Sequence, residues 1–412
     1  MHLVPEEEVL ICSAARTPIG RFDGNLAEYT AVDLGAVAVA AAVQRAGVDP
    51  ARVEAVTLGN VVHAGLGMGP AKAAAVKAGL PETVVARCVD TVCSSALEAV
   101  CLTVEAMVAG SLRVAVAGGM ESRSQAPYLL GPKFIRNAGA FAKGKRARMK
   151  RAGAYRWALE GDELDQLKAL EIKDSVSYDG LFWPADRKFM REYALLFAKK
   201  HGYTVEQINR YAEESHRKAR LAIENGWFAE EIAPCGEVAV DQLVPDEKLA
   251  AMREECAENP AGSYNASVPA DGAAAVLLAT GDAAKELGLT PLARVMAFSR
   301  AHCAAPEFLA APVTAAEEIA AALRAAGQPA DFPIIEANEA FGIQLPFFEA
   351  SFPGAAINVH GGAVALGHPL GAAGARLLTT LLYAMKRHQH PRGLVTLCFG
   401  GGGAVAIAVE KA

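Results

Sequence analysis

The stretch SSALEAVCLTVEAMVAGSLRVAVAGG, residues 94–119, indicates the class of fold. Its first part predicts a helix over Ser94–Ala109 that ends at Gly110. Because apolar residues lie on nearly all faces of this helix, we expect it to be buried on every side. Leu112–Ala117 then predicts a short apolar strand that ends at Gly118-Gly119. A buried helix followed by a buried strand is typical of a sheet that helices cover on both faces.

Outward from this stretch, both ends of the chain show the same alternation. In the N-terminal part, the predicted helix Asp33–Ala46, which Gly47 closes, lies between the predicted strands Val9–Ser13 and Val53–Gly59. Because a similar order returns near the C-terminus, we expect two similar α/β units. There a helix, a strand, a glycine run and a further strand are predicted at Gly371–Lys386, Gly393–Cys398, Gly400–Gly403 and Ala404–Glu410.

The region between the two ends, residues 123–262, has a different composition. It is richer in charged and long side chains, and we predict helices over Asp186–Lys200 and Val205–Asn225. Within it, the segment Gly131–Arg156 carries nine Lys or Arg residues and no acidic one. Two interpretations of this basic segment are open: a solvated surface loop, or a contact for an anionic partner.

The length and composition of the chain exclude several classes of protein. A chain of 412 residues is too long for one small core, so two or three domains are expected. A net charge of −6 argues against a general nucleic-acid binder. The first 18 residues lack the pattern of a signal peptide, and no apolar run reaches the roughly 18–20 residues of a membrane span. We therefore expect a soluble, cytoplasmic protein with no membrane span.

The eight cysteines contain no C-x2-C pair, so we expect free thiols and no zinc or other metal site. One of them, Cys93, stands between an extended segment and the first turn of the predicted helix. Free N–H groups and the helix dipole favour a thiolate there, and the same N–H groups could bind an oxyanion on a thioester. By itself, a cysteine at the start of a helix more often serves packing than catalysis.

A histidine in a glycine-rich segment is the next candidate. His368 lies between Gly367 and Pro369 in INVHGGAVALGHPLGAAGARLL. The glycines allow close backbone approach or positive φ, and Pro369 keeps the histidine out of the helical region. A histidine fixed just before a helix is suitably placed to act as a base, although a structural hydrogen bond is an equal alternative.

Two further candidates lie at the ends of predicted strands. Cys398 closes one strand, and Asn338 follows the predicted strand Pro333–Glu336. Side chains at such strand ends project into the loops where the active sites of α/β sheets form. Asn338 could orient a water molecule or donate to an oxyanion. The glycine run Gly400–Gly403 precedes a strand and not a helix, so it does not match a dinucleotide fingerprint.

Together these features resemble the thiolase family over nearly the whole chain. The resemblance implies a duplicated, layered α-β-α-β-α core with an inserted lid or loop domain. It divides the chain into a first core half at 1–122 plus 263–289, an inserted domain that binds CoA and acyl groups at 123–262, and a second core half at 290–412. The matching motifs, in the family's order, are ARTPIG at 15–20, Cys93 with Ser95, GGMESRSQAPYLL at 118–130, DGL at 179–181, NASVPADGAAAV at 265–276, NEAF at 338–341, GGAVALGHPLGAAGAR at 361–376 and CFGGGGAVA at 398–406.

The resemblance also implies a reaction. The enzyme would be an acyltransferase that cleaves or forms 3-oxoacyl-CoA, as in fatty acid metabolism. Cys93 would carry the acyl group as a thioester, His368 would take the thiol proton, and Cys398 would move a proton at the α-carbon of acetyl-CoA. Asn338, through a water, would share one oxyanion hole with His368, and the N–H groups of Cys93 and Gly400 would form the other.

Binding partners follow from the same resemblance. Coenzyme A and acyl-CoA would be substrates, with no additional cofactor. Ser267 would lie beside the pantetheine arm of CoA, and Met190 and Phe189 would border the acyl pocket and CoA cleft. A homodimer, or a dimer of dimers, built by pairing the core sheets is implied for the assembly.

Several positions near the nucleophile depart from the family's pattern. Ser94 and Ala96 stand where glycines are often found. Asp90 replaces an asparagine, and an ionised carboxylate there would raise the pKa of the thiol. These changes bear on the rate of reaction and not on the class of enzyme.

The segment KFMREYALLFAKK at 188–200 departs further. Arg191, Tyr193 and Leu195 replace a glycine, a threonine and a glutamate of the pattern. Phe189 stands where short-chain acetoacetyl-CoA enzymes commonly have histidine. Because these changes cluster in the inserted domain, we expect an intact catalytic set with unusual acyl specificity.

Two other functions compete with this interpretation. A decarboxylating ketoacyl synthase shares the fold but uses one cysteine and two histidines, whereas Asn338 and Cys398 occupy the relevant motifs here. A non-catalytic scaffold of the same fold that binds acyl-CoA is the other alternative. Retention of all four catalytic side chains argues against it.

Overall fold

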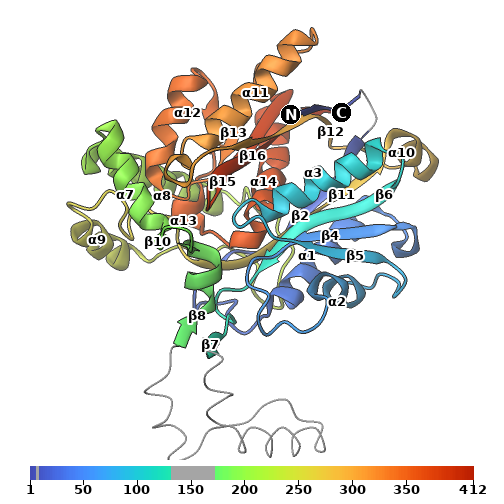
Figure 1. Ribbon diagram of the computed structural model, residues 1–412. Helices are drawn as coiled ribbons and strands as arrows, with labels where there is room; N and C mark the ends of the chain where they lie inside the picture. Colours follow the sequence, from blue (N-terminus) through green and yellow to red (C-terminus); the bar gives the residue numbers. More distant parts are fainter. Residues whose placement is uncertain (6–8, 131–171) are drawn as a thin grey trace, which may run out of the picture.

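Two half-sheets of the same topology form the centre of the computed structural model (Figure 1), which describes residues 1–5, 9–130 and 172–412. In the first half the strand order is β2-β11-β6-β4-β5. β11 pairs antiparallel with both β2 and β6, whereas β4 pairs parallel with both β6 and β5. The bounds are β2 (Val9–Arg16), β4 (Ala55–Gly59), β5 (Val85–Val89), β6 (Val114–Glu121) and β11 (Ala270–Thr280).

The second half-sheet repeats this arrangement with the order β12-β16-β15-β13-β14. Here β16 pairs antiparallel with both β12 and β15, whereas β13 pairs parallel with both β15 and β14. A short antiparallel contact between β12 and β2 joins the two halves. The predicted repeat of two α/β units is therefore confirmed. The bounds are β12 (Ala293–His302), β13 (Ile334–Ala337), β14 (Ala356–Ile357), β15 (Arg392–Phe399) and β16 (Gly403–Lys411).

The helices complete five layers. The helices α3 (Ser95–Val108) and α14 (Ala373–His388) lie between the half-sheets and share one apolar cluster with strands of both. On the outer face of the first half lie α1 (Ala31–Ala46) and α2 (Pro70–Lys77). On the outer face of the second lie α11 (Ala311–Ala325) and α12 (Leu345–Ser351). This is the layered α-β-α-β-α core that the resemblance to the thiolase family implied.

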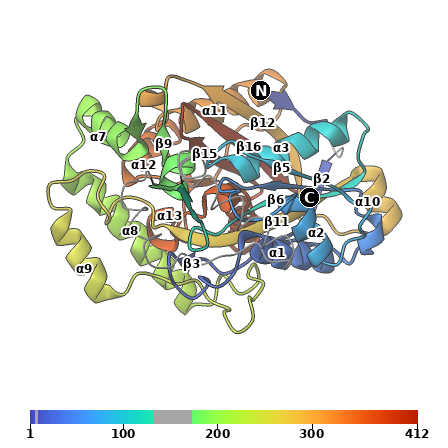
Figure 2. The same cartoon turned by 60° about the horizontal axis from the view of Figure 1, so that its bottom comes forward.

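The inserted region contributes helices to one side of the core. Figure 2 shows α7, α8 and α9 together on the side away from α10. The basic segment 131–156 lies outside the described residues. The division into domains at 123 and 263 stays a prediction, although β11 does complete the first half-sheet after the insertion. The bounds here are β7 (Tyr128–Leu130), β8 (Ile172–Asp174), β9 (Phe182–Trp183), β10 (Lys188–Phe189), α7 (Met190–His201), α8 (Val205–Glu224) and α9 (Asp246–Glu255).

The remaining elements are short. The strands β1 (His2–Leu3) and β3 (Gly20–Arg21) pair with β12 and β11. The helix α10 (Gly281–Leu287) follows β11, and α13 (Ala363–Leu366) packs against α8. A 3-10 turn at Leu370–Ala372 leads into α14.

Local sequence explains where the first helix begins and ends. Thr30 and Asp33 form a capping box at the N-terminus of α1, so the helix starts at Ala31, two residues before the predicted start. Gly47 ends it with a left-handed φ of 69°. The predicted C-terminal boundary is therefore confirmed.

Two sequence predictions about helices were wrong in part. The central helix α3 is not buried on every side, because Leu102 and Val108 are exposed on its second half. The helix predicted from Asp186 begins only at Met190. Arg187 has a positive φ of 61°, which a right-handed helix does not allow, and β10 follows it.

The predicted strand Leu112–Ala117 begins at Val114 and continues through both glycines to Glu121. These glycines are part of the strand because neighbouring backbone lies against them. A Cβ atom on Gly119 would overlap the carbonyl oxygen of Gly371, at the turn before α14. The absence of side chains lets the first and second halves of the core meet backbone to backbone.

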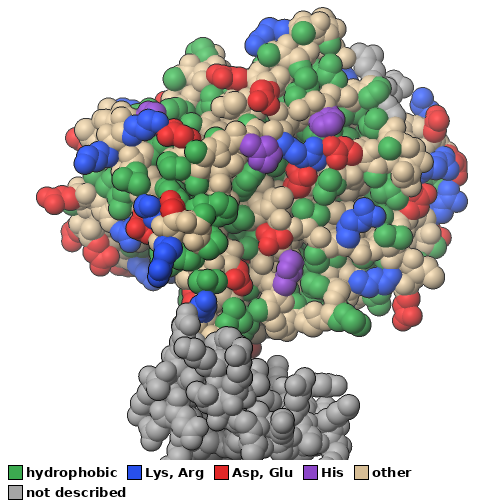
Figure 3. All heavy atoms as spheres, in the orientation of Figure 1, with side chains coloured by type: hydrophobic (Ala, Val, Ile, Leu, Met, Phe, Trp, Pro, Cys, Tyr) green, Lys and Arg blue, Asp and Glu red, His purple; other side chains and the backbone are tan. Residues whose placement is uncertain are grey.

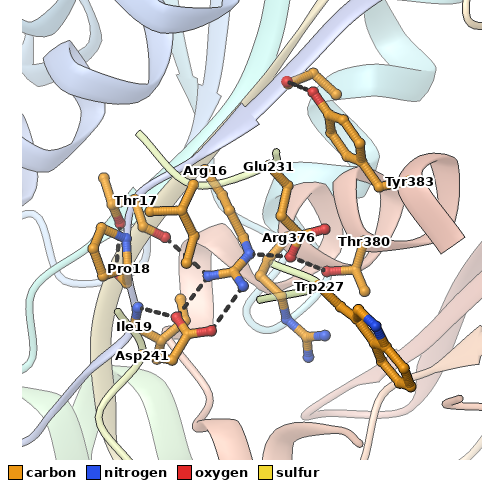
Figure 4. Close-up of polar contacts among 12 residues, drawn as sticks. Arg16, Thr17, Pro18, Ile19, Trp227, Glu231, Asp241, Arg376, Thr380 and Tyr383 are labelled. Carbon is orange, nitrogen blue, oxygen red and sulfur yellow. Dashed lines mark hydrogen bonds and ion pairs between the residues drawn. The ribbon is translucent and has the colours of Figure 1, made fainter. Parts of the chain in front are cut away.

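A fully buried arginine ties the core to the inserted region (Figure 4). Arg16, the last residue of β2, donates two hydrogen bonds to Asp241, at 2.7 and 2.8 Å. Its Nε donates to Glu231 at 2.5 Å, and Glu231 also accepts from the hydroxyl of Thr380 on α14 at 3.1 Å. Asp241 in turn accepts from the N–H of Ile19. This network holds three separate parts of the chain at one point.

We predict that Arg16→Met destabilises the protein by about 3–5 kcal/mol, because two buried carboxylates lose their cation. The measurement is the urea midpoint, followed by tryptophan fluorescence. The control is Arg52→Met, which removes an exposed ion pair with Glu286 and should cost about 0–1 kcal/mol. Equal midpoints for the two variants would show that the Arg16 network contributes little.

Candidate active site

The thiol of Cys93 lies in a tight turn between β5 and α3. Val92 has a positive φ of 51°, which is uncommon for a β-branched residue. The turn is closed by the hydroxyl of Ser95, which donates to the carbonyl of Val92 at 2.6 Å and accepts from the N–H of Thr91 at 2.9 Å. Cys93 itself is 7% exposed. In the chain, Cys93 lies two residues before Ser95, the first residue of α3, and is not part of the first helical turn.

The surroundings of Cys93 keep its thiol protonated. Burial raises the pKa of Cys93 to about 12, while a hydrogen bond from the N–H of Gly400 and the charge of Arg123 act in the opposite direction. A nearby carboxyl, that of Glu121, adds to the rise in pKa. Asp90 is exposed, and its carboxylate accepts a hydrogen bond from the N–H of Val92 at 3.0 Å. A thiol in this environment needs a base before it reacts as a nucleophile.

The imidazole of His368 is held by its backbone and has unpaired nitrogens. Gly367, with φ of 108°, turns the chain just before it, and the N–H of His368 donates to the carbonyl of Val268 at 2.8 Å. Both ring nitrogens are buried without a partner among the described residues. Burial, together with the charges of Arg123 and Arg376, lowers the pKa of His368 to about 3. The ring is therefore neutral and has one nitrogen free to accept a proton.

Cys398 is the last residue but one of β15, which continues to Phe399, and it is fully buried. Its sulfur accepts a hydrogen bond from the side-chain amide of Gln344 at 3.4 Å. Burial raises the pKa of Cys398, and the nearby thiol of Cys93 raises it further. The two sulfurs thus lie within range of each other's charge.

Asn338 follows β13, as predicted. Its N–H donates to the carbonyl of Thr396 at 3.0 Å, which fixes the residue beside β15. The side-chain amide is buried, and neither its oxygen nor its nitrogen has a partner among the residues that the structure describes. A buried amide without partners is costly and is typical of a site that binds a water or a ligand.

A cavity of about 450 Å³ opens beside the turn that carries Cys93, although the side chains of Cys93, His368, Cys398 and Asn338 are not part of its lining. Gly400, Met190 and Val92 line it near the sulfurs, and a Cβ atom on Gly400 would lie 2.8 Å from the sulfur of Met190. Aromatic and other side chains of the inserted region form its opposite wall. They are Tyr178, Leu181, Phe182, Trp183 and Pro184.

Phe189 and Ser267, the other two predicted binding residues, lie outside the lining of this cavity. Phe189 is 43% exposed and contacts the ring of Phe182, with 5.2 Å between the ring centroids. It supports the cavity wall from outside. Figure 3 shows hydrophobic side chains at the surface over this part of the inserted region. Ser267 is half-buried, and its N–H donates to the carbonyl of Ala340 at 3.0 Å.

Sequence reasoning missed the groups that hold the site together. The carboxylate of Glu121 accepts hydrogen bonds from the N–H groups of Val61, Val62 and Gly371, at 3.0, 3.2 and 2.9 Å. Burial raises the pKa of Glu121 to about 7, and these N–H groups oppose the rise. The motif GGMES contained this residue, but its sequence alone did not show that the carboxylate faces two separate loops.

The structure therefore brings several candidate residues to one place. Cys93 contacts Gly400, and Cys398 lies within range of its charge. Leu370, two residues after His368, packs in the same apolar cluster as Cys93. All eight cysteines are free thiols, as predicted. In the described part of the chain we find no group of three or more His, Cys, Asp or Glu suited to a metal ion, and no helix that could cross a membrane.

Comparison with known proteins agrees with this architecture. The family profile described as thiolase, N-terminal domain, matches residues 9–282, and the thiolase C-terminal domain matches residues 289–411. An acetyl-CoA acetyltransferase of Escherichia coli is 40% identical, over 98% of both chains. An acetyl-CoA acetyltransferase of Cupriavidus necator is 38% identical, over 98% of this chain and 99% of its own.

A solved structure gives the same result for the fold. The Acat5 thiolase from Ascaris suum, in complex with coenzyme A, superposes with a TM-score of 0.83. It is 32% identical in sequence, and the match covers 98% of this chain and all of that one. Neither a ketoacyl synthase nor a non-catalytic scaffold is favoured by these similarities. The chain belongs to the thiolase family and is a CoA-dependent acyltransferase.

Proposed function

We propose that the enzyme is an acyl-CoA:acetyl-CoA C-acyltransferase that works through a thioester on Cys93. The observation that carries this proposal is the buried Cys93 thiol, which accepts a hydrogen bond from the N–H of Gly400, in a core that also buries the His368 imidazole and the Asn338 amide without partners. Acyl transfer needs a base and oxyanion donors around one sulfur, and we assign these roles to His368, Asn338 and the backbone N–H groups. Coenzyme A and acyl-CoA are the substrates of this reaction.

In the first half-reaction, Cys93 takes the acyl group. The neutral ring of His368 accepts the thiol proton as the sulfur attacks the thioester carbonyl of the acyl donor. The new C–S bond forms to Cys93, the bond to the CoA sulfur breaks, and the proton passes from His368 to the departing CoA thiolate. The N–H groups of Cys93 and Gly400 stabilise the oxyanion of the tetrahedral intermediate.

In the second half-reaction, a carbon–carbon bond forms. The neutral ring of His368 accepts the proton of the Cys398 thiol, and the Cys398 thiolate then removes a proton from the α-carbon of acetyl-CoA and becomes a thiol again. The resulting carbanion attacks the acyl thioester, the bond to Cys93 breaks, and the departing Cys93 thiolate takes the proton from His368. Asn338, through a water, and His368 donate to the enolate oxygen. The reverse sequence is thiolysis, and the covalent intermediate implies ping-pong kinetics.

The inserted region supports the proposal of unusual acyl specificity. Arg191 and Leu195 are exposed on α7, so of the three departures only Tyr193 points into the protein. The wall opposite the sulfurs is aromatic, and Trp183 lies against Gly401 of the glycine run. An aromatic wall offers apolar contact area to a larger acyl group.

Ser267, Met190 and Phe189 are proposed to border the acyl chain and the pantetheine arm.

A homodimer is proposed as the smallest assembly. The strand β5 lies at the edge of the first half-sheet, and Val85 on it is 53% exposed. An exposed edge strand that carries β-branched residues is suited to pairing with a second copy.

The covalent intermediate can be tested by intact mass after incubation with acetyl-CoA. We expect an acetyl adduct on the wild type and none on Cys93→Ala. Cys398→Ala should still form the adduct but should lose about 10²–10⁴-fold in thiolysis, because its proton transfer is gone. Cys12→Ala, which removes a buried thiol on the distant β2 strand, is the control and should behave as wild type. An adduct on Cys93→Ala would refute the assignment.

The protonation state of the pair can be tested by alkylation of Cys93 with iodoacetamide. A folded pKa near 12 for the thiol and near 3 for His368 means that the thiol is protonated and the ring neutral throughout the neutral range. We therefore expect the rate in the free enzyme to rise steadily from about pH 6 to about pH 9, since only thiolate reacts. A plateau reached below about pH 7 would reveal a preformed thiolate–imidazolium pair instead.

Acyl specificity can be tested with a panel of 3-oxoacyl-CoAs. We expect kcat/KM for longer or branched chains to exceed that for acetoacetyl-CoA by at least about 10-fold, since each added methylene gains apolar contact. Trp183→Ala should reduce this preference, whereas Leu196→Ala, on the exposed face of α7, should not. Equal or faster cleavage of acetoacetyl-CoA by the wild type would contradict the proposed specificity.

A further inference from the structure

A guanidinium group lies beside the candidate active site and takes no part in the reaction scheme above. Arg123 follows the end of β6 by two residues, and its carbonyl accepts a hydrogen bond from the N–H of Ala126 at 3.3 Å. Ala126 packs against the apolar cluster that contains Cys93, Val61 and Val176. The turn that begins with Arg123 thus contributes directly to the surroundings of the nucleophile.

This turn is held from two sides. Asp271 on β11 accepts a hydrogen bond from the N–H of Ser124 at 3.0 Å and another from its hydroxyl. On the other side, the N–H of Ser175 donates to the carbonyl of Pro127 at 3.4 Å. Because its backbone is fixed, the Arg123 side chain starts from a defined place next to the apolar cluster that contains Cys93.

The guanidinium has no partner among the described residues. Its Nε is buried without a hydrogen bond, although the carboxylates of Glu121, Asp174 and Asp271 lie within range of its charge. Each carboxylate already accepts from other donors. Glu121 is occupied by backbone N–H groups, Asp271 by Ser124, and Asp174 by the N–H groups of Val176 and Ser177.

The positive charge of Arg123 acts on both the Cys93 thiol and the His368 imidazole. Burial raises the pKa of the Cys93 thiol and lowers that of the His368 imidazole, and the charge of Arg123 lowers both. Arg123 therefore lies within electrostatic range of the carbon that would be bonded to the Cys93 sulfur. The three carboxylates offset part of this charge, but none of them accepts a hydrogen bond from the guanidinium, so its N–H donors are available to a ligand.

We propose that Arg123 binds a carboxylate on the acyl group, so that the enzyme acts on 3-oxoacyl-CoAs whose chain carries a second, negatively charged group. This inference rests on the proposed function and specifies its substrate. A guanidinium donates two parallel hydrogen bonds to a carboxylate, which fixes its orientation as well as its charge. In an apolar pocket such a group rejects a neutral analogue strongly, because the cation is then left unpaired.

The test compares substrates that differ only in this charge. Thiolysis of 3-oxoadipyl-CoA and 3-oxopimelyl-CoA is measured against that of 3-oxohexanoyl-CoA and 3-oxoheptanoyl-CoA, in which a methyl group replaces the carboxylate. For at least one pair we expect kcat/KM of the wild type to be about 50-fold or more higher for the charged substrate. Arg123→Met should lower this ratio at least about 30-fold, and Arg123→Lys, which keeps the charge but not the fork, should give an intermediate value.

A matched control lies at the opposite end of the same strand. Arg113 directly precedes β6 and pairs with Glu286 at the surface, so Arg113→Met removes the same charge far from the site and should keep the wild-type ratio. The idea is overturned if the wild type prefers neither member of any pair, if Arg123→Met lowers both rates equally, or if Arg113→Met changes the ratio as much.

Intact mass separates this failure from failure of the proposed function. An acetyl adduct that forms on Cys93 of the wild type, together with no charge preference, would overturn the role of Arg123 alone. Absence of the adduct and of thiolysis on every substrate would overturn both proposals. The adduct also shows whether Arg123→Met is folded, since it requires an assembled site.

Discussion

The close backbone contact between Gly371 and Gly119 sets the geometry on which the rest of the site depends. Gly371 lies in the turn after His368, and Gly119 lies in β6 of the other half of the core. A side chain on either residue would overlap the facing backbone. Glu121 reinforces the contact, because its carboxylate accepts N–H groups from both halves. Main-chain packing therefore fixes the turn after His368 against the half of the core that carries Cys93, and such packing tolerates almost no displacement.

The second determinant is burial, which fixes the protonation states. Two thiols and an imidazole that are removed from water all favour their neutral forms. A stored thiolate on Cys93 would be destabilised by burial, and the charge of Arg123 offsets only part of this effect. The proposed scheme avoids this destabilisation, because the proton moves from Cys93 to His368 only when an acyl donor is bound. The unpaired nitrogens of His368 and the unpaired amide of Asn338 are then supplied with partners by the substrate and its water.

The sequence was sufficient to predict most helices and strands and to name the candidate site residues. It was not sufficient to predict the long-range contacts that hold these residues together. The predicted helix Asp33–Ala46 lies within two residues of the observed α1, because capping residues at both of its ends decide the boundaries. The prediction failed at 186–189, where Arg187 has a positive φ that apolar periodicity does not reveal. The family motifs named Cys93, His368, Cys398 and Asn338. They could not reveal that Glu121 joins two loops or that Arg16 joins three segments, because those contacts span more than 200 residues of sequence.

Reaction and specificity depend on different kinds of contact in this fold. Cys93, His368, Cys398 and Asn338 all lie at strand ends or glycine turns of the core, where neighbours meet through backbone and a substitution would displace the reacting atoms. The opposite wall of the cavity comes from side chains of residues 176–190, which can change size without moving the core. Arg123 lies where the two meet, since its turn is anchored to β11 of the core and packs against residues 174–176. A charge at this junction can alter which acyl group is accepted while leaving the reacting atoms in place, and this is the simplest physical route from one thiolase specificity to another.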